Sequence, residues 1–271
     1  MKRWRRKCAI YSRAGVSPVI STVILSTTLL TVMIITTGVA TDILRNQMAS
    51  NEFDSAKNLI KSISSEIDSL IYKSEASSVI KTSFFYTAPG YTETGKIMNV
   101  SFTGHGETFH VEENTFNIES IQGVGGSTDY TLEGSDVTAI PGYLGSFGRI
   151  YISKPYNWRV ALDYNRAQYT YAGVANLFNG VTTTPYNIVE VTVLELSFTQ
   201  FDTSDTAVII LRNDGVETNT FTLTGNWDMT VTTPDDGSYV VSLADMGGNV
   251  SHPTQVQFNK VNMNIHVMGG S

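Results

Sequence analysis

The chain opens with a cationic stub that leads directly into a long uncharged stretch. The stub contains Lys2, Arg3, Arg5, Arg6, Lys7 and Arg13, and no charged residue follows until Asp42. Residues 16–41 number 26. A helix rises about 1.5 Å per residue, so this one would exceed the roughly 30 Å of a bilayer core. The stretch therefore predicts a helix that crosses a membrane.

The flanking residues predict where this helix starts and how it is oriented. Ser17 is a suitable cap, and Pro18 suits the first helical turn, where its missing N–H costs nothing. Cations mark the cytoplasmic side of a membrane helix. We therefore expect a cytoplasmic N-terminus, a membrane-spanning segment, and everything after Asp42 outside the cell.

The junction between the stub and the apolar stretch suggests processing. A secretory leader is cut after its apolar core, whereas here the best site lies before it. The string Arg13-Ala14-Gly15-Val16-Ser17-Pro18-Val19-Ile20 resembles the class III signal of archaeal type IV pilins and archaellin-like filament subunits. The likeness covers roughly the first 50 residues. It implies that a prepilin peptidase cuts after Gly15, or alternatively after Ala14, so that Val16 begins the mature chain.

The resemblance also implies what the helix does. Bacterial type IV pilins usually carry Glu at the fifth mature position, where this chain has Ile20, so another contact would set subunit register. The expected assembly residues are Pro18, Val19, Ile20, Val23, Ile24, Leu25, Leu29, Leu30, Ile34 and Ile35. The expected partners are further copies of the chain in a homo-oligomeric surface filament, the prepilin peptidase, and an assembly ATPase and membrane platform acting in trans. The resemblance implies no cofactor and no catalysis, with adhesion as an additional role.

An alternative explains the cations and the apolar stretch equally well. The chain would be an uncleaved membrane anchor whose outer domain binds a glycan or another envelope component. It leaves the Gly-Val-Ser-Pro junction without an explanation, so we favour the filament subunit.

A helical rhythm continues beyond Asp42. Apolar residues recur every three or four positions at Phe53, Ala56, Ile60, Ile63, Ile67 and Leu70. The pattern predicts one helix over residues 16–82, amphipathic over 42–80. An unbroken helix from Pro18 to Ile80 would be on the order of 95 Å long. Its apolar stripe would pack on the protein's own core, on neighbouring subunits, or on both.

Residues 83–271 read as an extracellular β-rich domain. The stretch 188–198 alternates as a strand, and hairpins are predicted around Asn213-Asp214-Gly215 and around 234–237. The final strands are predicted at 254–258 and 261–267. We expect an α+β chain whose long N-terminal helix precedes an antiparallel β-sandwich or barrel, with a division into two sheets near 173–185 left open.

Composition limits the partners of the outer domain. Without the six stub cations, 12 Lys and Arg face 25 Asp and Glu, a net charge of −13. Nucleic-acid binding demands clustered Lys and Arg, so no nucleic-acid partner is expected. The single cysteine, Cys8, lies in the stub, so a cleaved chain would form no disulfide.

Few residues suggest chemistry. His105, His110 and Glu112 are weak metal-ligand candidates in no recognised zinc spacing, and a polar loop with a strand edge explains them better. They are the only support for an extracellular enzyme, which we do not expect. Asn99 and Asn249 begin Asn-x-Ser sequons and are candidate glycosylation sites. Aromatic residues crowd residues 143–171, which favours core packing over an adhesive surface.

Overall fold

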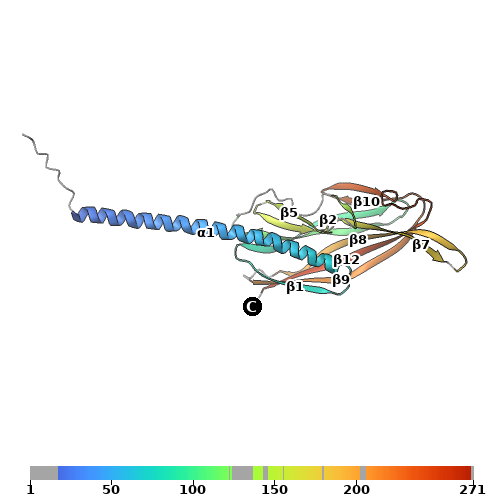
Figure 1. Cartoon of the computed structure of the whole chain (residues 1–271), viewed down its shortest axis with the longest axis horizontal. Coiled ribbons are helices and arrows are strands. Elements are labelled where there is room, and N and C mark those ends of the chain that lie inside the picture. Colours follow the sequence, from blue (N-terminus) through green and yellow to red (C-terminus); the bar gives the residue numbers. More distant parts are fainter. Residues whose placement is uncertain are drawn as a thin grey trace, which may run out of the picture. The chain divides into compact units, whose positions relative to one another are not determined.

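The computed structural model describes residues 18–121, 123, 137–142, 146–154, 156–178, 180–201 and 206–269. Over these residues the chain forms one long helix, α1 (Pro18–Leu70), and twelve strands (Figure 1). The strands are β1 (Ser77–Ser83), β2 (Thr87–Phe102), β3 (Thr108–Ser120), β4 (Ala139–Pro141), β5 (Arg149–Ser153), β6 (Arg159–Asp163), β7 (Ala167–Phe178), β8 (Thr183–Phe201), β9 (Thr206–Leu223), β10 (Asp228–Thr233), β11 (Gly237–Ser242) and β12 (Thr254–Gly269). The chain divides into two compact units, Met1–Gln47 and Met48–Ser271.

The second unit contains two six-stranded sheets. The first has the order β1-β9-β12-β8-β7-β4 and the second the order β11-β10-β2-β3-β6-β5. Most neighbours are antiparallel, while β12 with β8 and β4 with β7 are parallel pairs. The predicted α+β class, with a long N-terminal helix followed by a β-rich domain, is confirmed. Residues 173–178 of β7 pair with residues 183–188 of β8 within one sheet, so this region does not separate two domains.

Two hydrophobic cores hold this unit together. One lies between the sheets, where Val191 and Phe258 of the first sheet and Met98 and Trp227 belong to the same buried cluster. The other surrounds the second part of α1, whose stripe is buried at every position from Ala49 through Phe53, Ala56, Ile60, Ile63 and Ile67 to Leu70. Burial of a large apolar side chain contributes about 1.5–3 kcal/mol. The predicted stripe therefore packs on the protein's own core.

The helix ends about ten residues earlier than the sequence pattern suggested. It stops at Leu70, and residues 77–83 form β1, so the predicted helix over 16–82 and the domain boundary at residue 83 are wrong. Asn213 explains the stop, because its side-chain amide donates to the carbonyl oxygens of Leu70 and Ile71 at 2.9 and 3.3 Å. These carbonyls have no partner within the helix. The β-rich unit thus includes the second part of α1.

A carboxylate fastens the same part of α1 to the turn between β1 and β2. Glu52 accepts hydrogen bonds from the main-chain N–H groups of Phe85, Tyr86 and Thr87 at 2.8–3.0 Å, and from the Thr87 hydroxyl at 2.8 Å. Hydrogen bonds to a charged group contribute more than neutral ones, about 1.5–3 kcal/mol. Glu52 therefore couples the helix to the start of the second sheet.

Further along the helix, polar side chains meet the segment that precedes β5. The Ser146 hydroxyl donates to Asp68 Oδ2 at 2.9 Å and lies 3.2 Å from the Ser64 hydroxyl. Burial raises the pKa of Asp68 to about 6, although the hydrogen bond from Ser146 opposes that shift. Gly148 leaves room for this contact, because a Cβ there would lie 2.6 Å from Ser64 Oγ.

The sheets correct two predictions about strand ends. Asn213-Asp214-Gly215 is not a hairpin turn but a bulge within β9, since Gly215 pairs with Asn262, Asn213 pairs with Met263, and Asp214 is the extra residue. Likewise, residues 254–267 lie in one strand, β12, rather than two. The hairpin predicted around 234–237 is confirmed by the antiparallel pair β10–β11.

Candidate functional site

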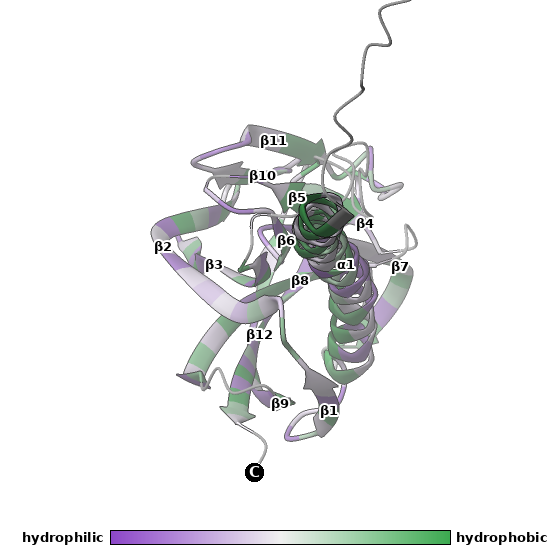
Figure 2. Cartoon of the chain, turned by 90° about the vertical axis from the view of Figure 1, so that its left-hand side faces the viewer, coloured by the Kyte–Doolittle hydropathy of each residue, from purple (hydrophilic) through white to green (hydrophobic). Residues whose placement is uncertain are grey.

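The apolar first part of α1 is the candidate functional surface. Gly15, Val16 and the alternative Ala14 lie outside the described residues, as does the predicted cap Ser17. The helix itself begins at Pro18. The predicted assembly residues Val19, Ile20, Val23, Ile24, Leu25, Leu29, Leu30, Ile34 and Ile35 all lie on it, each more than half exposed. Figure 2 shows this part of α1 in the green of hydrophobic residues.

Exposure here is complete rather than one-sided. Every side chain from residue 19 to residue 48 is exposed, and α1 is long and apolar enough to cross a membrane by length and composition. An apolar surface on every side of a helix is typical of a helix that lies in lipid or among other helices. Membrane association of the chain is therefore indicated by this helix.

Seven of the hydroxyl groups in this segment form hydrogen bonds within the helix itself. Thr22, Ser26, Thr27, Thr28, Thr31, Thr36 and Thr41 each donate to a carbonyl oxygen three or four residues earlier, at 2.7–3.1 Å. In an apolar environment an unpaired hydroxyl would cost several kcal/mol. These side chains therefore do not prevent the segment from lying in hydrocarbon, and they stay small enough for close helix contacts.

A notch interrupts the apolar surface near its C-terminal end. Gly38 has no side chain, and a Cβ built there would meet nothing within 4 Å. Ile34, Thr37 and Thr41 border the notch. Small residues let another helix approach closely, so this is the position on the segment where a second backbone meets the least obstruction.

The metal-ligand candidates separate into ordinary contacts. His105 stacks on Phe221 with ring centroids 3.9 Å apart. His110 Nδ1 lies 2.6 Å from Asn99 Oδ1, and the main-chain N–H of Glu112 donates to Glu195 Oε2 at 2.9 Å. Within the described part of the chain, no group of three or more His, Cys, Asp or Glu could hold a metal ion. The interpretation as a polar loop and strand edge fits these contacts.

The two sequons differ in setting. Asn99 lies within β2, is half-buried, and faces His110. Asn249 lies in the exposed segment before β12, where its side-chain oxygen accepts from the Ser251 N–H at 3.0 Å. Asn187 fixes that segment, because its amide donates to the carbonyl oxygen of Asn249 at 2.8 Å. Asn249 is the more accessible of the two candidates.

The aromatic stretch is mostly packing. Phe147 and Tyr164 are buried beside each other in the core around α1, with ring centroids 5.6 Å apart. Tyr169 and Tyr171 pack against the core between the sheets. Tyr156 is the exception, at 94% exposed. Tyr143 lies outside the described residues.

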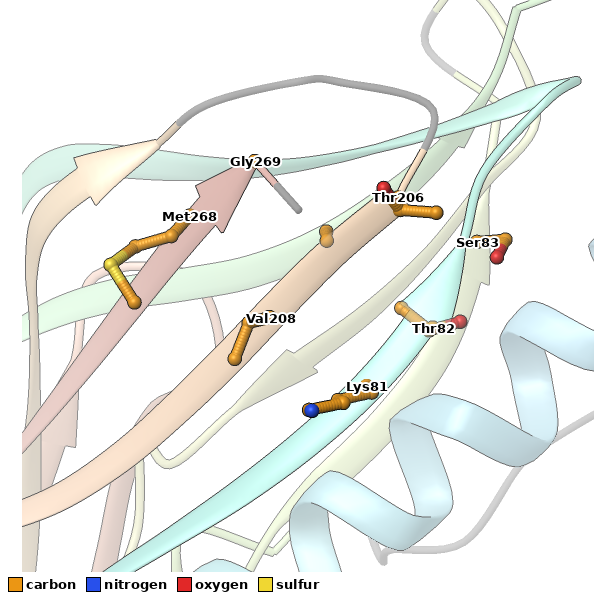
Figure 3. A pocket seen from close by; sticks show the side chains of 8 residues that line it. Lys81, Thr82, Ser83, Thr206, Val208, Met268 and Gly269 are labelled. Carbon is orange, nitrogen blue, oxygen red and sulfur yellow. The ribbon is translucent and has the colours of Figure 1, made fainter. Parts of the chain in front are cut away.

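A hollow of about 530 Å³ opens on one face of the first sheet. Figure 3 shows Val208 and Met268 on neighbouring strands, with Lys81 on β1 beside them. Lys81 is the one ionisable side chain among its described lining residues.

A second, smaller cleft was missed by sequence reasoning. It has a volume of about 230 Å³ and lies just past the C-terminal end of α1, between the following turn and the first sheet. Its lining includes Tyr72, Glu190, Thr192, Thr218, Gln257 and Asn259. No local pattern marks these residues, because they come from the turn and from three strands.

Strand pairing explains the polar floor of this cleft. Directly paired residues share a face of the sheet. One row across β7, β8, β12 and β9 reads Gln168, Thr192, Asn259 and Thr218, and the next row reads Thr170, Glu190, Gln257 and Thr220. Beneath α1 the same face turns apolar, with Leu194 and Val261 paired in the following row. The polar rows thus begin where the cover of the helix ends.

Comparison of the chain with protein-family models, with curated proteins and with solved structures finds no match. The function is therefore argued from the chain's own residues.

Proposed function

We propose that this chain is a structural subunit of an archaeal type IV pilus-like surface filament, cleaved by a prepilin peptidase after Gly15 and assembled through α1. One observation carries the proposal. A single helix joins a segment that is apolar on every side to a segment whose apolar stripe is already occupied by the β-rich unit. Among the residues that the structure describes, the side chains of the first segment stay exposed, and copies of the same segment can cover them.

The assembly mechanism follows from this division. Before cleavage the first segment lies in the membrane, with the cations of the stub on the cytoplasmic side. Cleavage removes these cations, and the segment can then leave lipid and bundle with other copies. Between apolar helices the gain comes from packing and from small residues at the contact, for which the notch at Gly38 and the self-satisfied Thr side chains are suited.

The intact mass of the chain recovered from membranes tests the proposal. After co-expression with an archaeal prepilin peptidase we expect a product that begins at Val16, and filaments visible by electron microscopy once the assembly ATPase and platform are added. A matched Gly15→Leu variant should keep its full-length mass. A wild-type chain that stays full length in the presence of active peptidase would contradict the proposal.

The second candidate is an uncleaved, membrane-anchored binding protein. The polar cleft beyond α1 favours it, because a cleft with convergent polar groups is typical of a ligand site. The same mass measurement separates the two, since an anchor keeps Met1 and remains a monomer in detergent.

A further inference from the structure

The polar cleft beyond α1 is organised before any ligand arrives. Asn259 is 7% exposed and lies at its centre. Its amide donates to Glu190 Oε1 at 2.8 Å, while its oxygen accepts from the Thr218 hydroxyl at 2.9 Å and from the Gln257 amide at 3.2 Å. These bonds hold four side chains from β8, β9 and β12 in fixed positions, which lowers the entropy cost of binding.

The network still has hydrogen-bonding capacity directed at a ligand. A carboxylate accepts at two oxygens and a carboxamide both donates and accepts. Among the residues that the structure describes, Glu190 Oε2 and the Gln257 carbonyl oxygen have no hydrogen-bond donor. The Thr192 hydroxyl lies in the same row as Asn259. The floor therefore presents acceptors and donors side by side, a pattern that matches neighbouring hydroxyl groups.

An aromatic side chain stands at the edge of this floor. Tyr72 is 71% exposed, and its hydroxyl lies 3.5 Å from Gln168 Oε1. Partial burial, and then the negative charges of Glu190 and Asp68, raise the pKa of the Tyr72 hydroxyl above its ordinary value. The hydroxyl stays a donor at neutral pH, and the ring offers an apolar surface at low conformational cost.

The charge and size of the cleft narrow the ligand class. Its described lining contains no Lys, Arg or His and includes the carboxylate of Glu190, so it disfavours phosphate and other anions. Its volume of about 230 Å³ lies below the roughly 300–1,000 Å³ of sites for drug-sized ligands. A small, neutral, polyhydroxylated ring satisfies both limits.

We propose that this cleft binds a single ring of a neutral saccharide, with Glu190, Gln257 and Asn259 bonding its hydroxyls and Tyr72 covering one face of the ring. The proposal does not depend on filament assembly, because an uncleaved anchor would carry the same cleft. It assigns the outer unit a ligand class that its acidic composition alone leaves open.

Saturation-transfer NMR on the full chain in a detergent without sugar headgroups tests the proposal. The probes are glucose, galactose, mannose and N-acetylglucosamine, with inorganic phosphate and glucuronate as anionic comparisons. We expect saturable binding of at least one neutral sugar in the millimolar range. Failure of all four to saturate, or binding of the anions alone, would overturn the proposal.

Variants locate the binding. Tyr72→Ala removes an exposed side chain and Asn259→Ala removes the centre of the network, and each should weaken binding at least tenfold. The matched control is Asn262→Ala, because Asn262 donates to Glu217 Oε1 at 3.0 Å from the opposite face of the same strand. Trp227 is 1% exposed, so tryptophan fluorescence, to which Trp4 and Trp158 also contribute, reports whether each variant is folded. Sugar binding that survives Tyr72→Ala in folded protein also overturns the proposal.

Discussion

The two parts of α1 belong to one continuous helix but differ in what surrounds their side chains. From residue 19 to residue 48 every side chain is exposed, and hydroxyl groups such as those of Thr27 and Thr31 bond back to their own helix. From Ala49 to Leu70 one stripe is buried, and polar side chains such as Glu52 and Ser64 reach other segments. The first part is therefore adapted to surroundings outside its own fold, whereas the second is a core element of the β-rich unit.

The strongest test of this difference between the two parts is to truncate one apolar side chain in each of them. Phe53 is 0% exposed, and Phe53→Ala should lower the free energy of unfolding of the β-rich unit by about 3–5 kcal/mol through the cavity it leaves. Ile34→Ala should leave that free energy unchanged within about 0.5 kcal/mol. Urea unfolding followed by tryptophan fluorescence in detergent measures both free energies. Equal losses would show that the two parts form one cooperative unit.

Removing a carboxylate from each part is the next test. Glu52→Ala leaves three main-chain N–H groups without their charged acceptor and should cost about 2 kcal/mol. Asp42→Ala, in the exposed part, is the control and should have no measurable effect. The same unfolding experiment measures both variants. If Glu52→Ala leaves the free energy of unfolding unchanged, water replaces the carboxylate at no cost.

The pH dependence of stability also distinguishes the two parts, because Asp68 lies in the second part of α1 and burial raises its pKa. Its pKa is about 6 in the folded chain against 3.8 as the ordinary value, so the folded state binds the proton more tightly. The stability that this protonation provides is present below about pH 4 and is lost as the pH rises through 6. The free energy of unfolding of Asp68→Asn should therefore increase relative to that of the wild type as the pH rises from 4 to 7. We expect about 1–2 kcal/mol, since Asp68 keeps part of its surface in water.

Unfolding curves of the wild type and Asp68→Asn at several pH values measure this difference. Because other carboxylates titrate in both proteins, only the difference between them is diagnostic. A difference that stays constant from pH 4 to pH 7 would remove Asp68 as its source.

The smallest expected effect concerns the hydroxyls. The Thr36 hydroxyl donates to a carbonyl oxygen of its own helix at 2.7 Å. Thr36→Val should therefore change the free energy of helix formation by less than about 0.5 kcal/mol and leave helix content and membrane retention unchanged. Ser64→Ala instead removes a contact with Ser146 and should cost about 1 kcal/mol. Circular dichroism, carbonate extraction and urea unfolding compare the two. A large loss for Thr36→Val would indicate that its hydroxyl bonds a neighbouring helix rather than its own.

Patterns between residues close in the sequence predicted the elements that depend on such residues. The apolar spacing from Phe53 to Leu70 identified a stripe that the structure buries throughout, and the alternation over 188–198 identified β8. The end of α1 was not predictable in this way, because the residue that caps it, Asn213, lies more than a hundred positions later. The same residue begins the bulge that sequence reasoning took for a hairpin turn.

The site was predictable only where it is contiguous. The exposed apolar residues from Val19 to Ile35 follow one another along a helix, and composition alone predicts this apolar segment. The cleft beyond α1 combines residue 72 with residues from 190 to 259, and only the register of three strands, β8, β9 and β12, brings them to one face. Sequence spacing carries no trace of that register.

The position of β12 also imposes an order of events on the chain. This last strand lies in the middle of its sheet, parallel to β8 on one side and antiparallel to β9 on the other. Until it arrives, β8 and β9 each present an open edge, and open edges invite pairing with other chains. The first sheet can therefore close only after residues 254–269 have been synthesised and are free to pair, so this strand completes the β-rich unit.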